Sequence, residues 1–304
     1  MVMPTKYLVC ILGPTASGKT TLAIQVAQHF NTHIISADSR QLYVGLNIGT
    51  AKATPEERAQ APHHFIDTLE ITEEYNAGQF ERDALALLEE LYKSHDVLVL
   101  AGGTGLYVQA LLYGLDEFPG TPDEVRQQVR DEYAEKGLGW LQKEIQHLDP
   151  DYYQIVDTQN PVRLMRALEV CRATGKPYSS LRSGEAKQRN FTPILIGLEW
   201  PRDQLYARID ERVDMMLQQG LIEETRQFHE HKAQQALQTV GYEELFAHFE
   251  GVYDLEEATR LIKRNTRHYA KRQMTWLKKM KGITGVTPFQ TQEVLLSIEH
   301  EIKQ

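Results

Sequence analysis

Cysteine is nearly absent from this sequence of 304 residues, which contains only Cys10 and Cys171. Two cysteines so far apart give no disulfide framework, and free thiols are typical of a reducing compartment. Their small number also excludes a zinc module built on several cysteine ligands. We therefore expect a cytoplasmic protein that depends on a hydrophobic core, for which 41% hydrophobic residues are sufficient.

Long apolar segments are missing as well. No stretch approaches the run of about 20 apolar residues that a membrane-spanning helix needs. The first apolar run is short and leads directly into a glycine-rich loop, unlike the layout of a secretory signal peptide. The sequence also lacks the Asn-Lys-x-Asp motif that reads guanine in regulatory GTPases. We expect no membrane association, and the sequence disfavours a GTPase.

Basic charge is scarce overall, because the net charge is −9. It is concentrated in one segment, 260–281, which carries nine Lys and Arg residues and no acidic residue, so that the rest of the chain carries −18. A basic stripe on an acidic protein is typical of a surface that binds a polyanion. The alternative is a solvated helix face whose cations pair with acids elsewhere in the fold. Charge alone does not decide between the two.

The most informative feature that is present is a glycine-rich loop near the start of the chain. It fits the pattern G-x-x-x-x-G-K-[ST], follows a buried-strand pattern at 7–12 and precedes helical spacing of apolar residues from Lys19 onward. Backbone N–H groups, the helix N-terminus and the lysine of such a loop attract phosphates, and the Thr20 hydroxyl can hold Mg²⁺. We predict a diphosphate or triphosphate site formed by Gly13, Pro14, Thr15, Ala16, Ser17, Gly18, Lys19 and Thr20.

A second strand, predicted at 33–36, leads into the segment Asp38-Ser39-Arg40-Gln41. Ligands of parallel sheets bind beyond the carboxyl ends of the strands, so Asp38 is expected beside the phosphate loop. There its carboxylate can accept a proton or help to hold a metal. Its alternative role is to cap its own turn, which Asp-Ser does well. His63 and His64 have no third ligand nearby in sequence, so no zinc site is expected.

A third strand, predicted at 97–100, ends in small residues instead of the metal-binding aspartate of an ordinary nucleotide triphosphatase. Gly102 and Gly103 permit a close approach of the backbone to a ligand. Thr104 is the only polar side chain of this turn, and we expect it to donate a hydrogen bond to phosphate or substrate.

Residues 118–190 contain no strand pattern and are predicted to form an all-helical insertion. Its first helix is predicted to start with a Thr121 cap, Pro122 at the first helical position and Glu124 completing a capping box. Gly137 is predicted to end that helix.

A later helix of the insertion is predicted to open at Asn160 and Pro161 and to end at Gly175. Arg163 and Arg166 are three residues apart and therefore share a face of this helix. They form either a phosphate clamp or merely paired surface arginines, and their spacing does not distinguish the two.

Strand character returns at 192–198, which indicates re-entry into the sheet. The predicted fold class is therefore α/β, a P-loop NTPase-like parallel sheet core with an all-helical insertion domain. The core comprises 1–117 and 191–304, and 118–190 is the insertion. A following helix at 205–217 carries Arg208 and Arg212 on one face.

The basic segment lies on a long helix that is predicted to begin at Asp254 or Leu255. Its Tyr269 and Trp276 could stack on bases, but aromatic residues at helical spacing are more typical of core anchors.

Eight motifs together carry a resemblance to a known family. In order they are the loop Gly13 to Thr20, Asp38-Ser39-Arg40-Gln41, Gly49-Thr50-Ala51-Lys52, Pro62-His63-His64, Gly102-Gly103-Thr104, Arg166-Ala167-Leu168-Glu169, Val240-Gly241-Tyr242 and Thr266-Arg267 through Lys271-Arg272-Gln273. This ordered set spans essentially the whole chain and resembles the bacterial tRNA dimethylallyltransferase family. Ala101 and Pro161 are minor departures from the family pattern, and Pro161 is acceptable at a helix start.

The resemblance implies transfer of a dimethylallyl group from dimethylallyl diphosphate to N6 of the adenosine 3′-adjacent to the anticodon in tRNA, with release of diphosphate. Mg²⁺, held at Thr20, is the implied cofactor, and we expect the enzyme to act as a monomer. Asp38 is the candidate general base, while Lys19 and Arg212 would stabilise the departing diphosphate. The residues implied at the RNA are Asp38, Ser39, Arg40, Gln41, Thr104, Arg126, Arg163 and Arg166, and those implied in catalysis are Asp38, Thr104 and Arg212.

A small-molecule kinase that uses ATP on the same core is the alternative. The phosphate loop, the missing aspartate after Leu100 and an insertion that could serve as a lid all fit it. The basic segment favours the RNA enzyme, because a small-molecule kinase has no need of a polyanion surface.

Overall fold

A computed structural model describes residues 5–288 and 290–303 of the chain. The chain divides into two compact units, one formed by the described residues of Met1–Leu112 and Gln188–Gln304, and the other by Tyr113–Lys187. We call the first the core unit and the second the helical insertion. The insertion boundaries predicted from the sequence, 118 and 190, differ from these by a few residues at each end.

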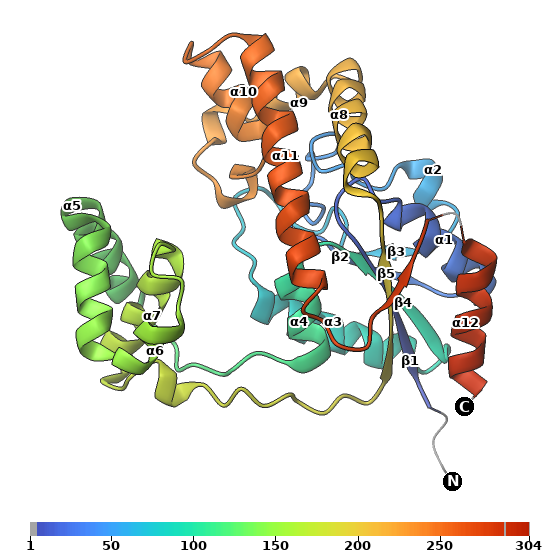
Figure 1. Cartoon of the computed structure of the whole chain (residues 1–304), viewed down its shortest axis with the longest axis horizontal. Helices are drawn as coiled ribbons and strands as arrows, with labels where there is room; N and C mark the ends of the chain where they lie inside the picture. The colour runs from blue at the N-terminus through green and yellow to red at the C-terminus, as the bar shows by residue number, and fades with distance from the viewer. Residues whose placement is uncertain (1–4, 289, 304) are drawn as a thin grey trace. The chain divides into compact units, whose positions relative to one another are not determined.

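The core unit is built on a six-stranded sheet in the order β3-β2-β4-β1-β5-β6 (Figure 1). Each pair of neighbouring strands is parallel. This arrangement, with a glycine-rich loop between the central strand β1 and α1, is the predicted P-loop NTPase-like α/β fold. The strands are β1 (Tyr7–Leu12), β2 (Ile34–Ala37), β3 (His63–His64), β4 (Val97–Gly102), β5 (Thr192–Leu198) and β6 (Thr284–Val286).

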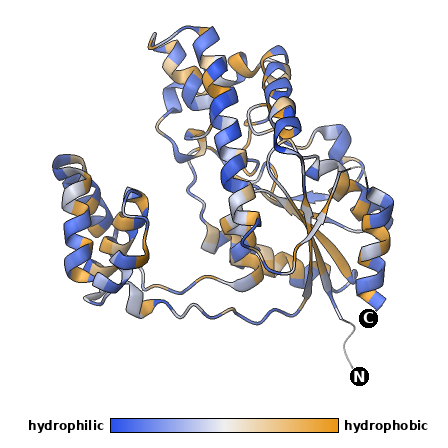
Figure 2. Cartoon of the chain, viewed as in Figure 1, coloured by the Kyte–Doolittle hydropathy of each residue, from blue (hydrophilic) through white to orange (hydrophobic). Residues whose placement is uncertain are grey.

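Parallel strands that are covered on both faces become almost continuously apolar, and this explains why the central strands could be predicted. Five consecutive residues of β1, Leu8 to Leu12, are fully buried. Figure 2 shows the central strands mainly in the hydrophobic colour and α11 mainly in the hydrophilic one. The helices of the core unit are α1 (Lys19–His29), α2 (Pro55–Arg58), α3 (Ala77–Leu91), α4 (Gly105–Tyr113), α8 (Arg202–Gln218), α9 (Leu221–Gln227), α10 (Tyr242–Phe249), α11 (Leu255–Leu277) and α12 (Thr291–Lys303), with short 3₁₀ turns at His229–His231 and Gln235–Leu237.

One hydrophobic core lies between the sheet and the pair α1 and α12, which pack side by side (Figure 1). Val9 and Ile11 of β1 meet Val294 and Ile298 of α12 within one buried cluster. β3 and β6 were not predicted, because strands of two or three residues give too little alternation to detect. The helix α12 was also not predicted. The other predicted strands are confirmed to within one or two residues.

The helical insertion contains α5 (Asp123–Leu148), α6 (Pro150–Ile155), α7 (Pro161–Thr174) and a short 3₁₀ turn at Ser179–Leu181, and its described residues contain no strand. The predicted end at Gly137 corresponds to a break inside α5, where φ is +72°. The Asn160 cap and the left-handed Gly175 at the end of α7 are both confirmed. A separate small core, including Val129, Leu141 and Leu168, holds these helices together.

The predicted capping box at the start of α5 is wrong. Pro122 occupies the N-cap position, and the cap has no side-chain hydrogen bond. The Thr121 hydroxyl is buried and instead accepts a hydrogen bond from Arg166 at 3.1 Å. A tertiary partner therefore replaces the local capping interaction that the sequence pattern favoured. No helix of the described residues is long and apolar enough to cross a membrane.

We expect Gly102→Ala to destabilise the core unit by about 1–3 kcal/mol, because it overpacks the junction of two strands. A Cβ atom at Gly102 would lie 2.3 Å from the carbonyl oxygen of Ala37 at the end of β2. Denaturant unfolding measures the effect. Gly139→Ala is the matched control, since no atom of the described residues lies within 4 Å of its added Cβ. Equal stability of Gly102→Ala and wild type would contradict this close packing.

Candidate active site

The glycine-rich loop turns sharply between β1 and α1. Ala16 and Gly18 adopt left-handed backbone angles, with φ of +62° and +91°. Lys19 Nζ donates a hydrogen bond to the Pro14 carbonyl at 2.7 Å. The Ser17 hydroxyl is fully buried and has no hydrogen-bond partner among the described residues. A buried polar atom without a partner costs free energy, so this loop has the properties of a site that a polar ligand completes.

Side chains from outside the loop hold it in this conformation. Trp200 Nε1 donates to the Ser17 carbonyl and Arg208 Nε to the Ala16 carbonyl, each at 3.0 Å. The Arg208 guanidinium lies over the Trp200 ring, 4.5 Å from its centroid. Sequence reasoning assigned no role to Trp200 and recorded only that Arg208 shares a face with Arg212. These two bonds occupy carbonyl oxygens, so they use none of the loop N–H groups that could bind an anion.

Two cations and one carboxylate interact across the site. Burial, followed by the nearby charge of Arg212, lowers the pKa of Lys19 to about 8, while Asp38 opposes the shift. Burial likewise lowers the pKa of Arg212, and the Asp38 charge acts in the opposite direction. Among the described residues, no carboxylate lies within ion-pair distance of the Arg212 guanidinium. The two cations are therefore only partly balanced, which favours an anionic ligand between them.

Asp38 caps its own turn and also lies beside the phosphate loop. Its Oδ1 accepts hydrogen bonds from the backbone N–H groups of Arg40 at 2.9 Å and Gln41 at 3.4 Å, which caps the turn. Within the described chain, its Oδ2 accepts none, so one oxygen remains available for chemistry. The carboxylate also lines a small cavity of about 40 Å³ beside the phosphate loop. The cavity is lined by Lys19, Thr20, Ala23, Ile34, Ser36, Asp38, Gln41, Ala53, His63, Ala101 and Gly102.

Thr104 connects the ends of two strands at this site. Its Oγ1 accepts a hydrogen bond from the Ser39 N–H at 3.0 Å, and its own N–H donates to the Ala37 carbonyl at 3.2 Å. Tyr269 of α11 also reaches this region. Burial and then the Asp38 charge raise the pKa of Tyr269 to about 12, and a side-chain hydrogen bond with Thr104 opposes the shift. Tyr269 was interpreted as a core anchor, whereas the structure brings its half-buried phenol to the candidate site.

Side chains of α11 pack closely against the glycines that follow β4. A Cβ atom at Gly103 would lie 2.3 Å from Gln273 Nε2, and one at Gly105 would lie 2.6 Å from the Trp276 ring. The close approach to a ligand that the sequence suggested for Gly102 and Gly103 is thus, in this structure, an approach of Ala37 and Gln273. These contacts fix the turn that carries Thr104.

The motif 49–52 is held by a buried carboxylate that sequence reasoning missed. Glu224 accepts hydrogen bonds from the N–H groups of Asn47, Ile48 and Gly49 and from the Tyr242 hydroxyl, the last at 2.6 Å. The carbonyls of this loop then accept hydrogen bonds from Gln41 Nε2. Glu224 therefore supports Gln41 at the cavity. A glutamate in a polar helix resembles a surface residue in sequence, so only Tyr242 in its motif gave a signal.

The basic segment divides into paired and unpaired cations, so the interpretation as a paired, solvated face holds for only part of it. Lys263 and Arg267 each form an ion pair with an aspartate of α8 at 2.6 Å, and Arg260 pairs with Glu257 in the preceding turn of α11. Arg264 donates a hydrogen bond to Asn265 Oδ1 at 3.1 Å. The remaining five cations have no carboxylate within ion-pair distance in the described chain, and all of them are exposed. We call them the free basic cluster: Lys271, Arg272, Lys278, Lys279 and Lys281.

The arginines of the insertion have different surroundings. Arg166 bonds to Thr121 and pairs with Glu169 at 3.4 Å, as the paired-arginine alternative expects. Arg163 is exposed and has no acidic partner within the described residues. Arg126 pairs with Asp123 at 3.4 Å.

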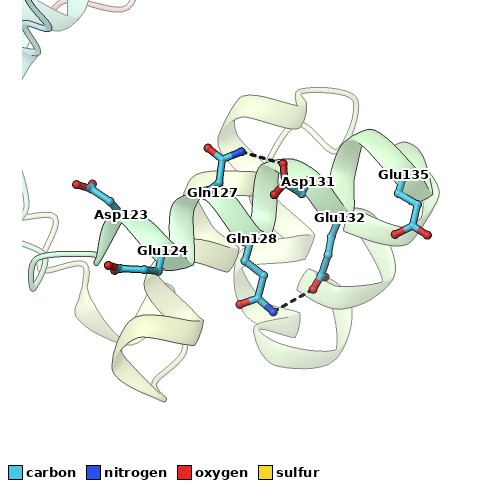
Figure 3. A pocket seen from close by; sticks show the side chains of 7 residues that line it. All are labelled: Asp123, Glu124, Gln127, Gln128, Asp131, Glu132 and Glu135. Carbon is cyan, nitrogen blue, oxygen red and sulfur yellow. Dashed lines mark hydrogen bonds between the residues drawn. The ribbon is translucent and has the colours of Figure 1, made fainter.

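One face of α5 is acidic, and this limits where an RNA can bind on the insertion. Figure 3 shows this face, which forms a shallow depression lined only by acidic and amide side chains. Carboxylates in such number repel a polyanion, so this face is unsuited to RNA phosphates. Its residues are Asp123, Glu124, Gln127, Gln128, Asp131, Glu132 and Glu135.

The residues of the site also bear on the expected metal. In the described part of the chain, no group of three or more His, Cys, Asp or Glu side chains could hold a metal ion. Thr20 and Asp38 line the same cavity, however, and both present oxygen atoms. Mg²⁺ prefers oxygen ligands and is commonly bound through one or two protein groups together with substrate phosphates and water. The donors present therefore fit Mg²⁺ bound together with a phosphate ligand.

The fold and the site together define an α/β enzyme core of the P-loop NTPase-like class. Comparison with known proteins gives the family. The model of the family described as IPP transferase matches residues 41–280. The chain is 47% identical to the tRNA dimethylallyltransferase of Cytophaga hutchinsonii, over 98% of both chains, and 50% identical to that of Christiangramia forsetii, over 90% of this chain and 91% of the relative. The chain belongs to the IPP transferase family and is a prenyl-transferring enzyme.

Solved structures agree with this assignment. The tRNA isopentenylpyrophosphate transferase of Bacillus halodurans is 33% identical, with a TM-score of 0.73 over 98% of this chain and 97% of that chain. A eukaryotic dimethylallyltransferase acting on tRNA is 28% identical, with a TM-score of 0.79 over 97% of this chain and 78% of that chain. Membership of a prenyl-transferring family rules against the small-molecule kinase and the GTPase as alternatives.

Proposed function

We propose that this enzyme transfers the dimethylallyl group of dimethylallyl diphosphate to the exocyclic N6 of the adenosine 3′-adjacent to the anticodon in tRNA, and releases diphosphate. The observation that carries the proposal is the pairing of a cationic phosphate loop with a carboxylate across one small cavity. Lys19, Arg212 and Asp38 are close enough to influence one another electrostatically. An anionic leaving group and a proton acceptor are the two things this transfer needs at one place.

The phosphate loop grips the leaving group. A loop of this kind binds a prenyl diphosphate as readily as a nucleotide, because it recognises only the phosphates. As the carbon–oxygen bond breaks, negative charge accumulates on the diphosphate. Lys19 and Arg212 stabilise that charge, together with the N–H groups that point into the loop. The Ser17 hydroxyl, which is buried without a partner, gains one when phosphate oxygens are bound.

Asp38 activates the nucleophile. Adenine N6 is a weak nucleophile because its lone pair is delocalised into the ring, and removal of its proton during bond formation lowers the barrier. Asp38 Oδ1 is used to cap the turn at Arg40, while Oδ2 is free to accept the proton. The turn thus orients the base by its own hydrogen bonds.

Thr20 and, in second place, Asp38 would hold Mg²⁺ at this site, since both present oxygen atoms to the cavity. When bound, Mg²⁺ supplies positive charge to the diphosphate oxygens. The residues of the chain retain their own roles: Lys19 binds phosphate and Asp38 receives the proton.

The RNA is bound by residues that meet either the target base or the backbone. Asp38 and Gln41 line the cavity, and Thr104 accepts a hydrogen bond from the Ser39 N–H between them. Segment 38–41 and Thr104 are proposed to contact the target adenosine, which must be unstacked to enter. We propose that three arginines of the insertion contact RNA: Arg126, Arg163 and Arg166. Arg163 is the best candidate for a phosphate contact, because it has no acidic partner among the described residues, whereas Arg126 and Arg166 each pair with an acid. Enclosure of the base excludes water, which would otherwise intercept the prenyl group.

We further propose a cytoplasmic, monomeric enzyme.

The activity is tested directly with labelled dimethylallyl diphosphate and unmodified tRNA. The proposal expects label in the RNA at the adenosine next to the anticodon and release of one diphosphate for each group transferred. Label that never reaches RNA, while ATP is consumed with a small acceptor, would overturn it.

The free basic cluster provides a second prediction. Replacing Lys271, Lys278 and Lys279 with alanine is expected to weaken tRNA binding and to flatten its salt dependence, by about 0.7 in the logarithmic slope for each lost phosphate contact. Filter binding over a range of salt concentrations measures both. Lys263→Ala is the control, because Asp214 already pairs with this lysine. An unchanged slope in the triple variant would assign the cluster a structural role only.

A further inference from the structure

A buried glutamine of α11 bonds to both loops that border the candidate site. Gln273 is only 7% exposed. Its Oε1 accepts a hydrogen bond from the Thr15 N–H of the phosphate loop at 2.8 Å, and its Nε2 donates to the Gly103 carbonyl at 3.0 Å. Neither partner belongs to α11, so these bonds contribute nothing to the helix itself.

The two loops that Gln273 connects have different tasks under the proposed function. The phosphate loop grips the leaving group, while the turn after β4 carries Thr104, which bonds to the Ser39 N–H next to Asp38 at 3.0 Å. An amide side chain suits such a connection, because one planar group carries an acceptor and a donor at a fixed separation. Asparagine carries the same amide on a side chain that is one methylene shorter, and an apolar side chain provides neither bond.

We propose that Gln273 is a positioning residue that keeps the phosphate loop in its binding conformation and in register with the Thr104 turn. This inference rests on the proposed function. Gln273 directs the Thr15 N–H to itself and away from the ligand, and so fixes the orientation of the peptide that precedes the left-handed Ala16. A loop prepared in this way binds diphosphate without first having to be ordered.

Two features next to Gln273 support its role in positioning the phosphate loop. Gly103 is shaped for this contact, since a Cβ atom there would lie 2.3 Å from Gln273 Nε2. The adjacent Arg272 and Lys271 are exposed and belong to the free basic cluster. One turn of α11 therefore presents cations to solvent on one side and holds the phosphate loop on the other.

The test is the steady-state kinetics of Gln273→Met, which preserves length and removes both hydrogen bonds. We expect the KM for dimethylallyl diphosphate to rise about tenfold, while the KM for tRNA stays within twofold of wild type. Thr275→Ala is the control on the same helix, because the Thr275 side chain is exposed and its hydroxyl, among the described residues, bonds only to the Lys271 carbonyl at 2.9 Å. It should leave both constants unchanged. An unchanged KM for the diphosphate in folded Gln273→Met, or an equal rise in both constants, overturns the inference.

A second variant tests the same contact from its other side. Gly103→Ala would displace the amide, so it should raise the KM for dimethylallyl diphosphate in the wild-type background. It should add little in a Gln273→Ala background, where the displaced group is already missing. Additive effects would contradict the inference. If wild-type enzyme transfers no dimethylallyl group to tRNA, the proposed function fails instead, and the two failures are distinguished.

Discussion

Replacing Asp38 with asparagine is expected to lower the rate of prenyl transfer by about 10²-fold or more while leaving tRNA binding nearly intact. Asparagine keeps an oxygen at the position of Oδ1, so the hydrogen bonds from Arg40 and Gln41 that cap the turn can persist. It removes the ability to accept a proton at neutral pH. Single-turnover rates at saturating substrate isolate the chemical step, and a separate binding titration measures tRNA affinity.

The comparison with Asp38→Ala separates the two roles of this residue. Alanine removes both the cap and the base, so it should slow transfer at least as much and also lower the stability of the protein by about 1 kcal/mol. If Asp38→Asn transferred at the wild-type rate, Asp38 would be a turn cap only and the base would have to be another group.

Loss of the Arg212 guanidinium is expected to produce the second large effect, a reduction of about 10²–10³-fold in the rate of transfer. Arg212 is half-buried, and within the described residues it has no acidic partner in ion-pair distance. Its charge is therefore available to the diphosphate at the moment when the leaving group becomes more negative. Arg212→Ala and Arg212→Lys, assayed in single turnovers with dimethylallyl diphosphate, measure the loss.

Arg202→Ala is the matched control on the same helix. Arg202 is exposed at the start of α8, and its guanidinium lies over the Tyr206 ring, 5.1 Å from the centroid. It should leave the rate within twofold of wild type. If Arg212→Ala had no larger effect than Arg202→Ala, the cationic side of the site would consist of Lys19 and the loop alone.

The parts of the site that could be predicted are those formed by residues that are consecutive in sequence. The phosphate loop is such a case, because a short strand, the motif 13–20 and the helix that begins within this motif follow one another along the chain. Asp38 and Thr104 were located by a general property of parallel sheets, that functional residues gather beyond the carboxyl ends of neighbouring strands. β2 and β4 are hydrogen-bonded neighbours, and this brings the two residues together.

The parts that could not be predicted are pairings between residues far apart in sequence. Gln273 and Thr15 are 258 residues apart, and Glu224 and Asn47 are 177 apart. The amphipathic pattern of α11 indicates which face is buried, but it does not identify what that face meets. The same limit applies to charge: nothing in the sequence distinguishes Lys263, which pairs with Asp214, from Lys271, which has no such partner in the described chain.

Local signals also failed where a tertiary contact was stronger. Thr121 and Glu124 fit a capping box, yet the Thr121 hydroxyl bonds to Arg166 on another helix. Tyr269 fits an anchor in the core, yet its phenol interacts with Thr104 and with the charge of Asp38. In both cases the spacing of residues predicted the helix correctly, but it did not predict which residue the side chain contacts.

A crystal structure with a non-cleavable dimethylallyl diphosphate analogue and an unmodified anticodon stem-loop tests the central claim most directly. The account predicts the diphosphate in the loop 13–20 with Lys19 on its oxygens. It also predicts N6 of the target adenine within about 2.6–3.2 Å of Asp38 Oδ2. A diphosphate bound away from this loop, or an adenine whose N6 cannot reach Asp38, would contradict it.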